Sequence, residues 1–438
     1  MNESMEKQFE TLLKGYFEGH PPEPFVPGQT PVPVGWASYG PEEVQRVLRV
    51  LLSGWISSGP ECREFEGAFA RYIGVRHAVA VNSGSSANLV MMTALVESGR
   101  LPRGSEVIVP AATFATAVSP VLQAGLCPVF VDVEPRTYNI SPQAIEQAIG
   151  PKTRAILVVH TLGLPAEMDA IMAIAGRHHL MVLEDCCEAH GTTYQDRRVG
   201  SFGSVATFSF YVAHNMTTGE GGMIVTSDPE MDAVLRSLRE FGRLKQPASL
   251  PFSYRDGVLT DYDNRYVFER LGYNVRMTDT IAAFGIEQLK KLDTFNAQRI
   301  ATANYYTDHL ESFRDWIQTP TVPEGIVHTY YAYPVVVRQG APYSRQQLAR
   351  FLEERKIETR ALFGGSLIDQ PAFRRLGLRT IGELPVTRWL RDCCFFIGCH
   401  PGIGEAARAY VTQCFQEFFT KQPGWGEART PQESGVKV

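Results

Sequence analysis

The sequence of 438 residues lacks any uncharged apolar run of the roughly 20 residues that a helix needs to cross a bilayer. It also lacks an excess of positive charge, because 42 Lys and Arg are outnumbered by 47 Asp and Glu, for a net charge of −5. We therefore expect neither membrane insertion nor binding to a nucleic-acid backbone. The first residues are acidic where a secretory signal is basic and apolar, so a cytoplasmic location is expected.

Cysteine is scarce as well. The eight cysteines are scattered along the chain without the spacing of a disulfide framework or of a zinc knuckle. Cys393, Cys394 and Cys399 lie close together but among apolar residues, where packing as small hydrophobic side chains is the expected role. The sequence therefore predicts reduced thiols and no metal site.

The chain does contain short β-rich runs that alternate with helical periodicity. This alternation is typical of an α/β fold in which a mostly parallel sheet lies between helices. A hydrophobic content of 44% is enough for a large core. The predicted strands are 77–81, 106–109, 128–131, 155–160, 181–184, 205–210 and 223–226.

The domain organisation follows from changes in composition and periodicity. We expect an N-terminal helix and a proline-rich arm at 1–34, and a large α/β domain at 35–300 whose first part can pack with the next domain. A smaller α+β domain is expected at 301–420. The last residues, 421–438, carry proline, glycine and charge without periodicity and are expected to form a flexible tail.

The first segment that suggests chemistry is NSGSSAN at 82–88, which follows a predicted strand and opens a predicted helix. Backbone N–H groups at a helix N-terminus, with small hydroxyl side chains beside them, can bind a phosphate group. Taken alone, the segment is better explained as a turn in which a serine caps the helix.

The second segment is LEDCCEAHG at 183–191, which begins at the carboxyl end of a predicted strand. Ligands of open α/β sheets bind at those strand ends, so a carboxylate there faces a cleft. Asp185 can keep a pyridine ring nitrogen protonated and thereby make the ring an electron sink. An acidic helix cap is the alternative for this residue.

The third segment, SFYVAHNMTTGEGG at 209–222, links two predicted strands and contains His214, which alone would be taken as a structural histidine. In this order, and together with PAATF at 110–114 and GYNVRMT at 272–278, the segments resemble the sugar aminotransferase family of fold-type I pyridoxal phosphate enzymes. The resemblance runs from about residue 35 to about residue 401. It implies a mostly parallel seven-stranded sheet and a smaller C-terminal α+β domain.

In that family a lysine normally occupies the position of His214 and forms a Schiff base with the cofactor. Imidazole cannot form a stable imine, but it can move protons near neutral pH. The chain is therefore similar to the 3-dehydratase branch, which holds pyridoxamine phosphate non-covalently and removes the C3 hydroxyl of nucleotide-linked 4-keto-6-deoxyhexoses. The segments TRALFGG at 359–365 and FIG at 396–398 also resemble this branch.

The CDP-sugar members of the branch carry a [2Fe–2S] cluster on cysteines located a few tens of residues beyond the histidine. Residues 240–274 of this chain contain no cysteine, and such clusters require mostly thiolate ligands. We therefore expect no iron–sulfur cluster, which leaves a similarity to the cluster-free members. Whether the nucleotide is GDP, CDP or dTDP stays open.

The resemblance implies roles for individual residues. His214 is the expected catalytic base. Asp185 is also expected to take part in catalysis, by pairing with the ring nitrogen of the cofactor. Phe114 is expected to stack on the cofactor ring, Asp185 to pair with the ring nitrogen, and Glu188 to lie near the ring hydroxyl. The cofactor phosphate is expected to be bound by Ser85, Ser86 and Ser209, and by Asn274 from the second subunit of a homodimer. For Asn274 a turn residue is the alternative.

The expected function is thus a dehydratase of deoxysugar biosynthesis, in which an amino acid, with glutamate as the expected donor, regenerates the pyridoxamine form. Three alternatives stay open. A partner reductase can supply electrons to the bound intermediate, or a different lysine, such as Lys245, can support aminotransfer. The third is a protein that only binds the cofactor as a scaffold, which the retention of Asp185 and of the serines disfavours.

Overall fold

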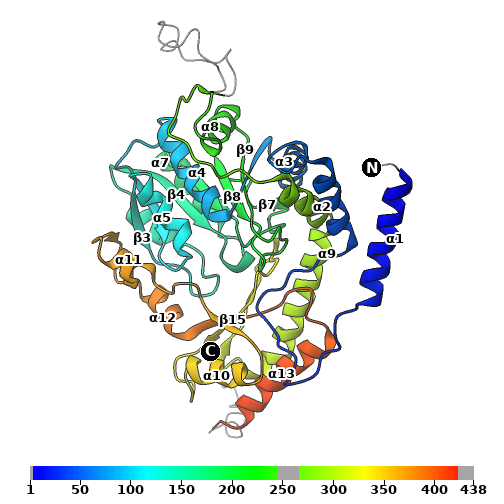
Figure 1. Cartoon of the computed structure of the whole chain (residues 1–438). Coiled ribbons are helices and arrows are strands. Elements are labelled where there is room, and N and C mark those ends of the chain that lie inside the picture. Colours follow the sequence, from blue (N-terminus) through cyan, green and yellow to red (C-terminus); the bar gives the residue numbers. More distant parts are fainter. Residues whose placement is uncertain (1–2, 245–265, 423–438) are drawn as a thin grey trace, which may run out of the picture.

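The computed structural model describes residues 3–244 and 266–422 (Figure 1). Its centre is a sheet of eight strands, in the order β1, β9, β8, β5, β4, β2, β3, β14. In the same order, the strands are His77–Val81, Gly222–Thr226, Val205–Ser209, Met181–Asp185, Thr153–Val159, Glu106–Pro110, Cys127–Val131 and Arg379–Thr380.

All seven predicted strands are present, and the predicted α/β class with a mostly parallel sheet is confirmed. Strands β8, β5, β4, β2, β3 and β14 pair in parallel, whereas β9 is antiparallel to both of its neighbours. The predicted number of strands is one too low. The additional strand, β14, has only two residues, and such a short run has no alternation that the sequence could reveal.

Helices cover both faces of this sheet, because successive strand residues point to opposite faces and both sets are apolar. On one face α4 (Gly84–Glu97), α5 (Ala115–Gln123) and α8 (Pro229–Arg239) pack on residues such as Val107 and Leu183. On the other face, α6 (Pro142–Ala148) and α7 (Met168–His178) cover Ile108 and Ile156. The phenylalanines of α3 (Pro60–Ile73) pack on the same face beside Phe208.

A second core lies around a four-stranded antiparallel sheet in the C-terminal part. Its strands, in spatial order, are β10 (Ile317–Gln318), β12 (Tyr333–Val337), β15 (Cys394–Ile397) and β13 (Thr359–Ala361). Helices α10 (Arg345–Glu354) and α13 (Glu405–Thr420) pack against it. Cys394 and Cys399 are buried in apolar cores here, and all eight cysteines are free thiols.

One helix of 32 residues, α9 (Asp279–Leu310), connects the two cores. Its first half packs beside α3, and its last turns contribute Ala303, Tyr306 and Leu310 to the second core (Figure 1). The boundary predicted at residue 300 therefore falls inside a continuous helix. The division into a large and a small domain stays a proposal.

The N-terminal helix α1 (Glu3–Gly19) lies at the outer edge of the molecule beside α2 (Pro41–Ser53) (Figure 1). The proline-rich arm then reaches the second core, where Val32 pairs with Ile357. The predicted flexible tail falls almost entirely outside the described residues. Within 3–244 and 266–422, none of the helices combines the length and the apolar character that a membrane span requires.

The remaining elements are short. They are the strands β6 (Thr193–Tyr194), β7 (Arg197–Arg198) and β11 (Ile326–Val327), which form a third sheet, and the helices α11 (Pro371–Arg374) and α12 (Pro385–Cys393).

Candidate active site

The predicted site residues gather at the carboxyl edge of the large sheet, where ligands of open α/β sheets bind. Asp185 is the last residue of β5, and Ser209 is the last residue of β8. Phe114 follows β2 after a short loop, and α4 begins directly after β1. The parallel arrangement of the sheet therefore brings these segments to one edge.

The N-terminus of α4 approaches Ser209 closely because residue 84 has no side chain. A Cβ atom on Gly84 would lie 2.5 Å from Cβ of Ser209 and 3.2 Å from Sγ of Cys187. The hydroxyl oxygen of Ser83 accepts a hydrogen bond of 3.0 Å from the backbone N–H of Ser86, so Ser83 caps the helix. Ser85 is exposed and Ser86 is half-buried. The helix cap thus uses the backbone N–H of Ser86, whose hydroxyl also accepts a hydrogen bond of 2.9 Å from Ser83, so Ser86 takes part in the cap as well as in the predicted phosphate-binding segment.

The carboxylate of Asp185 is held in a fixed orientation. One oxygen accepts a hydrogen bond of 2.8 Å from the amide of Asn88, and the other accepts one of 3.1 Å from the backbone N–H of Cys187. Thr207 donates to the amide oxygen of Asn88 at 2.7 Å and so fixes the amide. The sequence analysis assigned no role to Asn88, although this residue ends the predicted phosphate-binding segment.

Glu188 is buried, and one of its carboxyl oxygens accepts a hydrogen bond of 2.6 Å from the backbone N–H of Leu162. Burial raises the pKa of Glu188 to about 8, and the nearby charge of Asp185 acts in the same direction. At neutral pH the side chain is therefore mostly a neutral carboxyl, which can donate as well as accept a hydrogen bond.

His214 lies in the loop after β8, with its ring centre 5.1 Å from that of Tyr331. Burial lowers the pKa of His214 to about 3, and the positive charge of Arg299 contributes to this shift. The imidazole is thus neutral at physiological pH and available as a base. Arg299 comes from α9 and donates a hydrogen bond of 3.1 Å to the backbone carbonyl of His214, a contact that nothing in the sequence pattern indicates.

Two predicted residues lie at the margin. Phe114 is 55% exposed at the start of α5, and its ring is 6.4 Å from that of Phe363. Asn274 is exposed and pairs through its backbone with Glu240. Within the described residues it forms no hydrogen bond with the other predicted site residues, so its role across a dimer stays a prediction.

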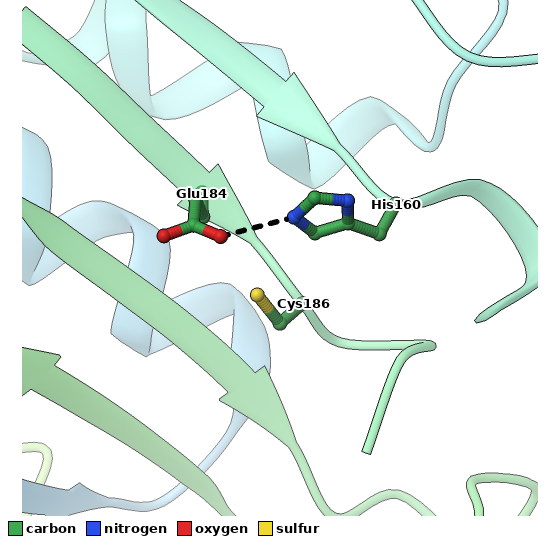
Figure 2. A group of neighbouring side chains, drawn as sticks. All are labelled: His160, Glu184 and Cys186. Carbon is green, nitrogen blue, oxygen red and sulfur yellow. Dashed lines mark hydrogen bonds and ion pairs between the residues drawn. The ribbon is translucent and has the colours of Figure 1, made fainter. Parts of the chain in front are cut away.

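Three side chains near the end of β5 form a group of potential metal ligands: His160, Glu184 and Cys186 (Figure 2). Glu184 accepts a hydrogen bond of 3.1 Å from Nε2 of His160, whose Nδ1 accepts one from the backbone N–H of Ala166. Three further backbone N–H groups donate to the same carboxylate. Burial raises the pKa of the Cys186 thiol well above its usual value. The satisfied hydrogen bonds of Glu184 and His160 and the protonated thiol of Cys186 fit a structural network and not a metal site.

A cavity of about 520 Å³ lies between the start of α3 and the end of α8. Five arginines and the two carboxylates of Glu66 and Glu240 line it, which gives the lining three more positive than negative charges. The cavity is therefore an electropositive pocket, which the sequence analysis did not predict because its residues come from distant segments. These arginines are Arg63, Arg236, Arg239, Arg243 and Arg276.

The raised pKa of Glu188 leads to a prediction about stability. Between pH 4.5 and about 8 the unfolded chain releases this proton while the folded chain keeps it, so Glu188 lowers the free energy of unfolding as the pH rises, by up to about 1.4 kcal/mol per pH unit. Glu188→Gln keeps an oxygen for Leu162 but does not titrate. In urea unfolding of the cofactor-free protein, the variant should therefore gain stability over the parent between pH 5 and pH 7.5. A difference that is constant over this range would contradict the assignment.

Comparison with known proteins places this geometry in a family. Residues 38–416 match the DegT/DnrJ/EryC1/StrS aminotransferase family. The chain is 38% identical over 429 residues to the lipopolysaccharide biosynthesis protein RfbH of Salmonella typhimurium, which covers 95% of this chain and 98% of that protein. It is 37% identical over 409 residues to a dTDP-4-dehydro-2,6-dideoxy-D-glucose 3-dehydratase of Saccharopolyspora spinosa, over 91% of this chain and 88% of the relative.

A solved structure of GDP-4-keto-6-deoxymannose-3-dehydratase with a trapped PLP-glutamate geminal diamine has the same fold. The TM-score is 0.79 at 30% sequence identity, over 87% of this chain and 99% of the solved one. The resemblance predicted from the sequence is confirmed: the chain belongs to the DegT/DnrJ/EryC1/StrS aminotransferase family.

Proposed function

We propose that this protein is a dehydratase that removes the C3 hydroxyl of a nucleotide-linked 4-keto-6-deoxyhexose, with pyridoxamine phosphate held non-covalently. The observation that carries the proposal is His214, a neutral imidazole at the position where the family normally has its Schiff-base lysine. A residue that can move a proton but cannot hold the cofactor covalently favours elimination over transfer of the amino group. Relatives that carry the name of 3-dehydratase support the same function.

The residues at the carboxyl edge fit this cofactor. The N-terminus of α4 can bind the phosphate with the help of Ser85, Ser86 and Ser209, because Gly84 has no side chain and allows Ser209 to lie close to this helix end. The exposed ring of Phe114 can cover one face of the pyridine, and Glu188 can contact the ring hydroxyl. When bound, pyridoxamine phosphate supplies an amine that condenses with the sugar ketone and a ring that accepts electrons.

Each functional side chain then has one task. His214 removes the proton from the C4′ carbon of the cofactor, next to its amine, as the C3 hydroxyl leaves the sugar. Asp185, held by Asn88 and by the backbone of Cys187, keeps the ring nitrogen protonated and so stabilises the developing negative charge. Hydrolysis would then give the 3-deoxy-4-keto sugar, ammonia and pyridoxal phosphate, so an amino donor would be needed to restore the amine form of the cofactor. The glutamate adduct of the related dehydratase supports glutamate as this donor.

The electropositive pocket supports a nucleotide-linked substrate, because five guanidinium groups suit the diphosphate of such a sugar. Arg276 lies in the same segment as Asn274, the residue that we propose to reach the cofactor of the second subunit in a homodimer. In that arrangement the pocket serves the active site of the partner. The subunits then share each site, and the dimer is required for activity.

The alternatives predict different cofactors or products. A cluster-dependent deoxygenase would need thiolate ligands beyond His214, where residues 240–274 contain no cysteine. An aminotransferase would need another lysine, and the candidate Lys245 lies outside the described residues. A scaffold has no use for a carboxylate oriented by Asn88. Cluster-free dehydration is the proposal that these residues favour.

The direct test is a product assay. The purified protein is incubated with pyridoxamine phosphate, glutamate and a panel of GDP-, CDP- and dTDP-linked 4-keto-6-deoxyhexoses. We expect one of them to lose the mass of its C3 oxygen without gaining nitrogen, with no reductase present and no stoichiometric iron in anaerobically prepared protein. An amino sugar as the main product, or a requirement for a reductase, would refute the proposal.

Restoring the family residue tests the role of position 214. In His214→Lys the lysine should form a bond to pyridoxal phosphate that borohydride makes permanent, while dehydration falls by roughly 10²-fold or more. Intact mass after borohydride treatment shows the adduct, and the same product assay gives the rate. His214→Gln, which lacks both amine and base, is the matched control and should show neither adduct nor dehydration. A covalent adduct in the parent protein would show that its cofactor is tethered through another residue.

The electropositive pocket can be tested separately from the chemistry. Arg243→Ala removes one positive charge from the pocket and should raise KM for the nucleotide sugar about tenfold, with little change in kcat. Added salt should reduce the difference between variant and parent, because salt screens the interaction. Arg71→Ala, a change in the last turn of α3 outside the lining of the pocket, serves as the control. Equal effects of the two changes would show that the pocket does not bind the substrate.

A further inference from the structure

Among the buried polar atoms near the catalytic base that have no hydrogen-bond partner within the described residues, three belong to residues that line one cavity. They are Nδ1 of His214, Oδ1 of Asn215 and Nε of Arg299. All three residues line one small cavity, of about 10 Å³, which is room for a single water molecule. Buried polar atoms almost always have a partner, so three such atoms around one cavity call for a common explanation.

The chemistry of two of these atoms is fixed by their neighbours. The amide nitrogen of Asn215 donates to Oδ1 of Asn296 at 2.9 Å and to the carbonyl of Thr329 at 3.0 Å. The orientation of this amide is therefore set, and its Oδ1 needs a donor. The terminal nitrogens of Arg299 donate to the carbonyls of His214, Tyr330 and Tyr331, which leaves Nε–H as a donor that needs an acceptor.

The proposed function fixes the chemistry of the third atom. A base must have a nitrogen that lacks a proton and is accessible, and Nδ1 of His214 is sealed from solvent. The reacting nitrogen is then Nε2, which is not among the buried atoms without a partner. Because a neutral imidazole carries one proton, that proton is on Nδ1, and the buried N–H needs an acceptor.

Resting on the proposed function, we propose that one water molecule in this cavity accepts hydrogen bonds from His214 Nδ1–H and Arg299 Nε–H and donates one to Oδ1 of Asn215. Asn215 and Arg299 are then positioning residues that hold this water as the acceptor of the Nδ1 proton of His214. The proton on Nδ1 stays in place through the reaction, while Nε2 takes up and releases the proton that His214 removes from the cofactor. A single water satisfies all three atoms, since it can accept two hydrogen bonds and donate two.

Water differs from a carboxylate in this position by its lack of charge. The titratable and charged groups that face His214 are Arg299 from α9, His190 from the loop after β5, Tyr211 from its own loop and Tyr331 before β12. Burial holds the pKa of His190 well below its usual value and that of Tyr331 well above it. Arg299 is thus the charged member of this group at neutral pH. The water orients the imidazole but does not stabilise its protonated form. A carboxylate partner would stabilise that form through its negative charge.

The test uses cofactor-free protein and two direct measurements. A crystal structure at high resolution should show a density peak at about 2.7–3.2 Å from each of the three atoms. Nitrogen NMR of histidine-labelled protein should show His214 protonated on Nδ1 and not on Nε2, with its signals assigned by their loss in His214→Gln. A cavity without density, a direct bond between Nδ1 and Asn215, or a proton on Nε2 would overturn the inference.

Variants separate positioning from packing. Asn215→Ala removes the oxygen that holds the water and should mix the two tautomers and lower kcat about tenfold with little change in KM. Asn215→Asp keeps an oxygen there, so the Nδ1 proton should be retained, but its negative charge should raise the pKa of His214. Asn296→Ala is the control, because it removes a neighbour of the Asn215 amide nitrogen and leaves Oδ1 in place. A shift of tautomer in Asn296→Ala as large as in Asn215→Ala would show that packing alone is responsible.

The two proposals fail in different ways. Protein that holds the water and the Nδ1 proton but dehydrates no sugar of the panel would refute the proposed function alone. Protein that dehydrates a sugar but carries the proton on Nε2, or has no water in the cavity, would refute this inference alone.

Discussion

The geometry of the site depends on the hydrogen bonds that the carboxylate of Glu184 accepts. It is fully buried and accepts hydrogen bonds from His160, at the end of β4, and from the backbone N–H groups of Gly200, Phe202 and Gly203, which lead into β8. A buried charge is tolerated because several donors surround it. It fixes the ends of three adjacent parallel strands relative to one another. The next residue is Asp185, whose side chain points to the opposite face of the sheet, toward α4.

Burial also determines the charge state of the site. It raises the pKa of the Glu188 carboxyl and lowers that of the His214 imidazole, so both groups are largely neutral at pH 7. An anionic ligand bound nearby stabilises the protonated imidazole and so makes His214 a stronger base. The basicity of His214 is therefore expected to be greatest when the anionic ligand is bound, which limits proton transfer in its absence.

The sequence predicted what depends on local pattern. The seven long strands are apolar and bounded by turn residues, and Asp185 could be placed because it follows a predicted strand, whereas Ser209 was predicted through the family resemblance. The pattern could not reveal contacts between distant segments. Arg299 lies 85 positions from His214, and its fit depends on the carbonyls of a third segment at 330–331. Asn274 is a different case, because a role across a dimer depends on a second chain.

The position of Arg299 would allow both the histidine of this chain and the lysine that the resemblance implies for other members at position 214. A buried guanidinium whose terminal nitrogens donate to three backbone carbonyls disfavours any second positive charge beside it. It keeps an imidazole unprotonated, as a base requires, and it would equally keep a lysine amine unprotonated, as attack on an aldehyde requires. In the proposed function, Asp185 and the N-terminus of α4 would bind the same cofactor atoms in either case. A single substitution can therefore exchange a covalent anchor for a mobile proton carrier without rebuilding the surrounding site.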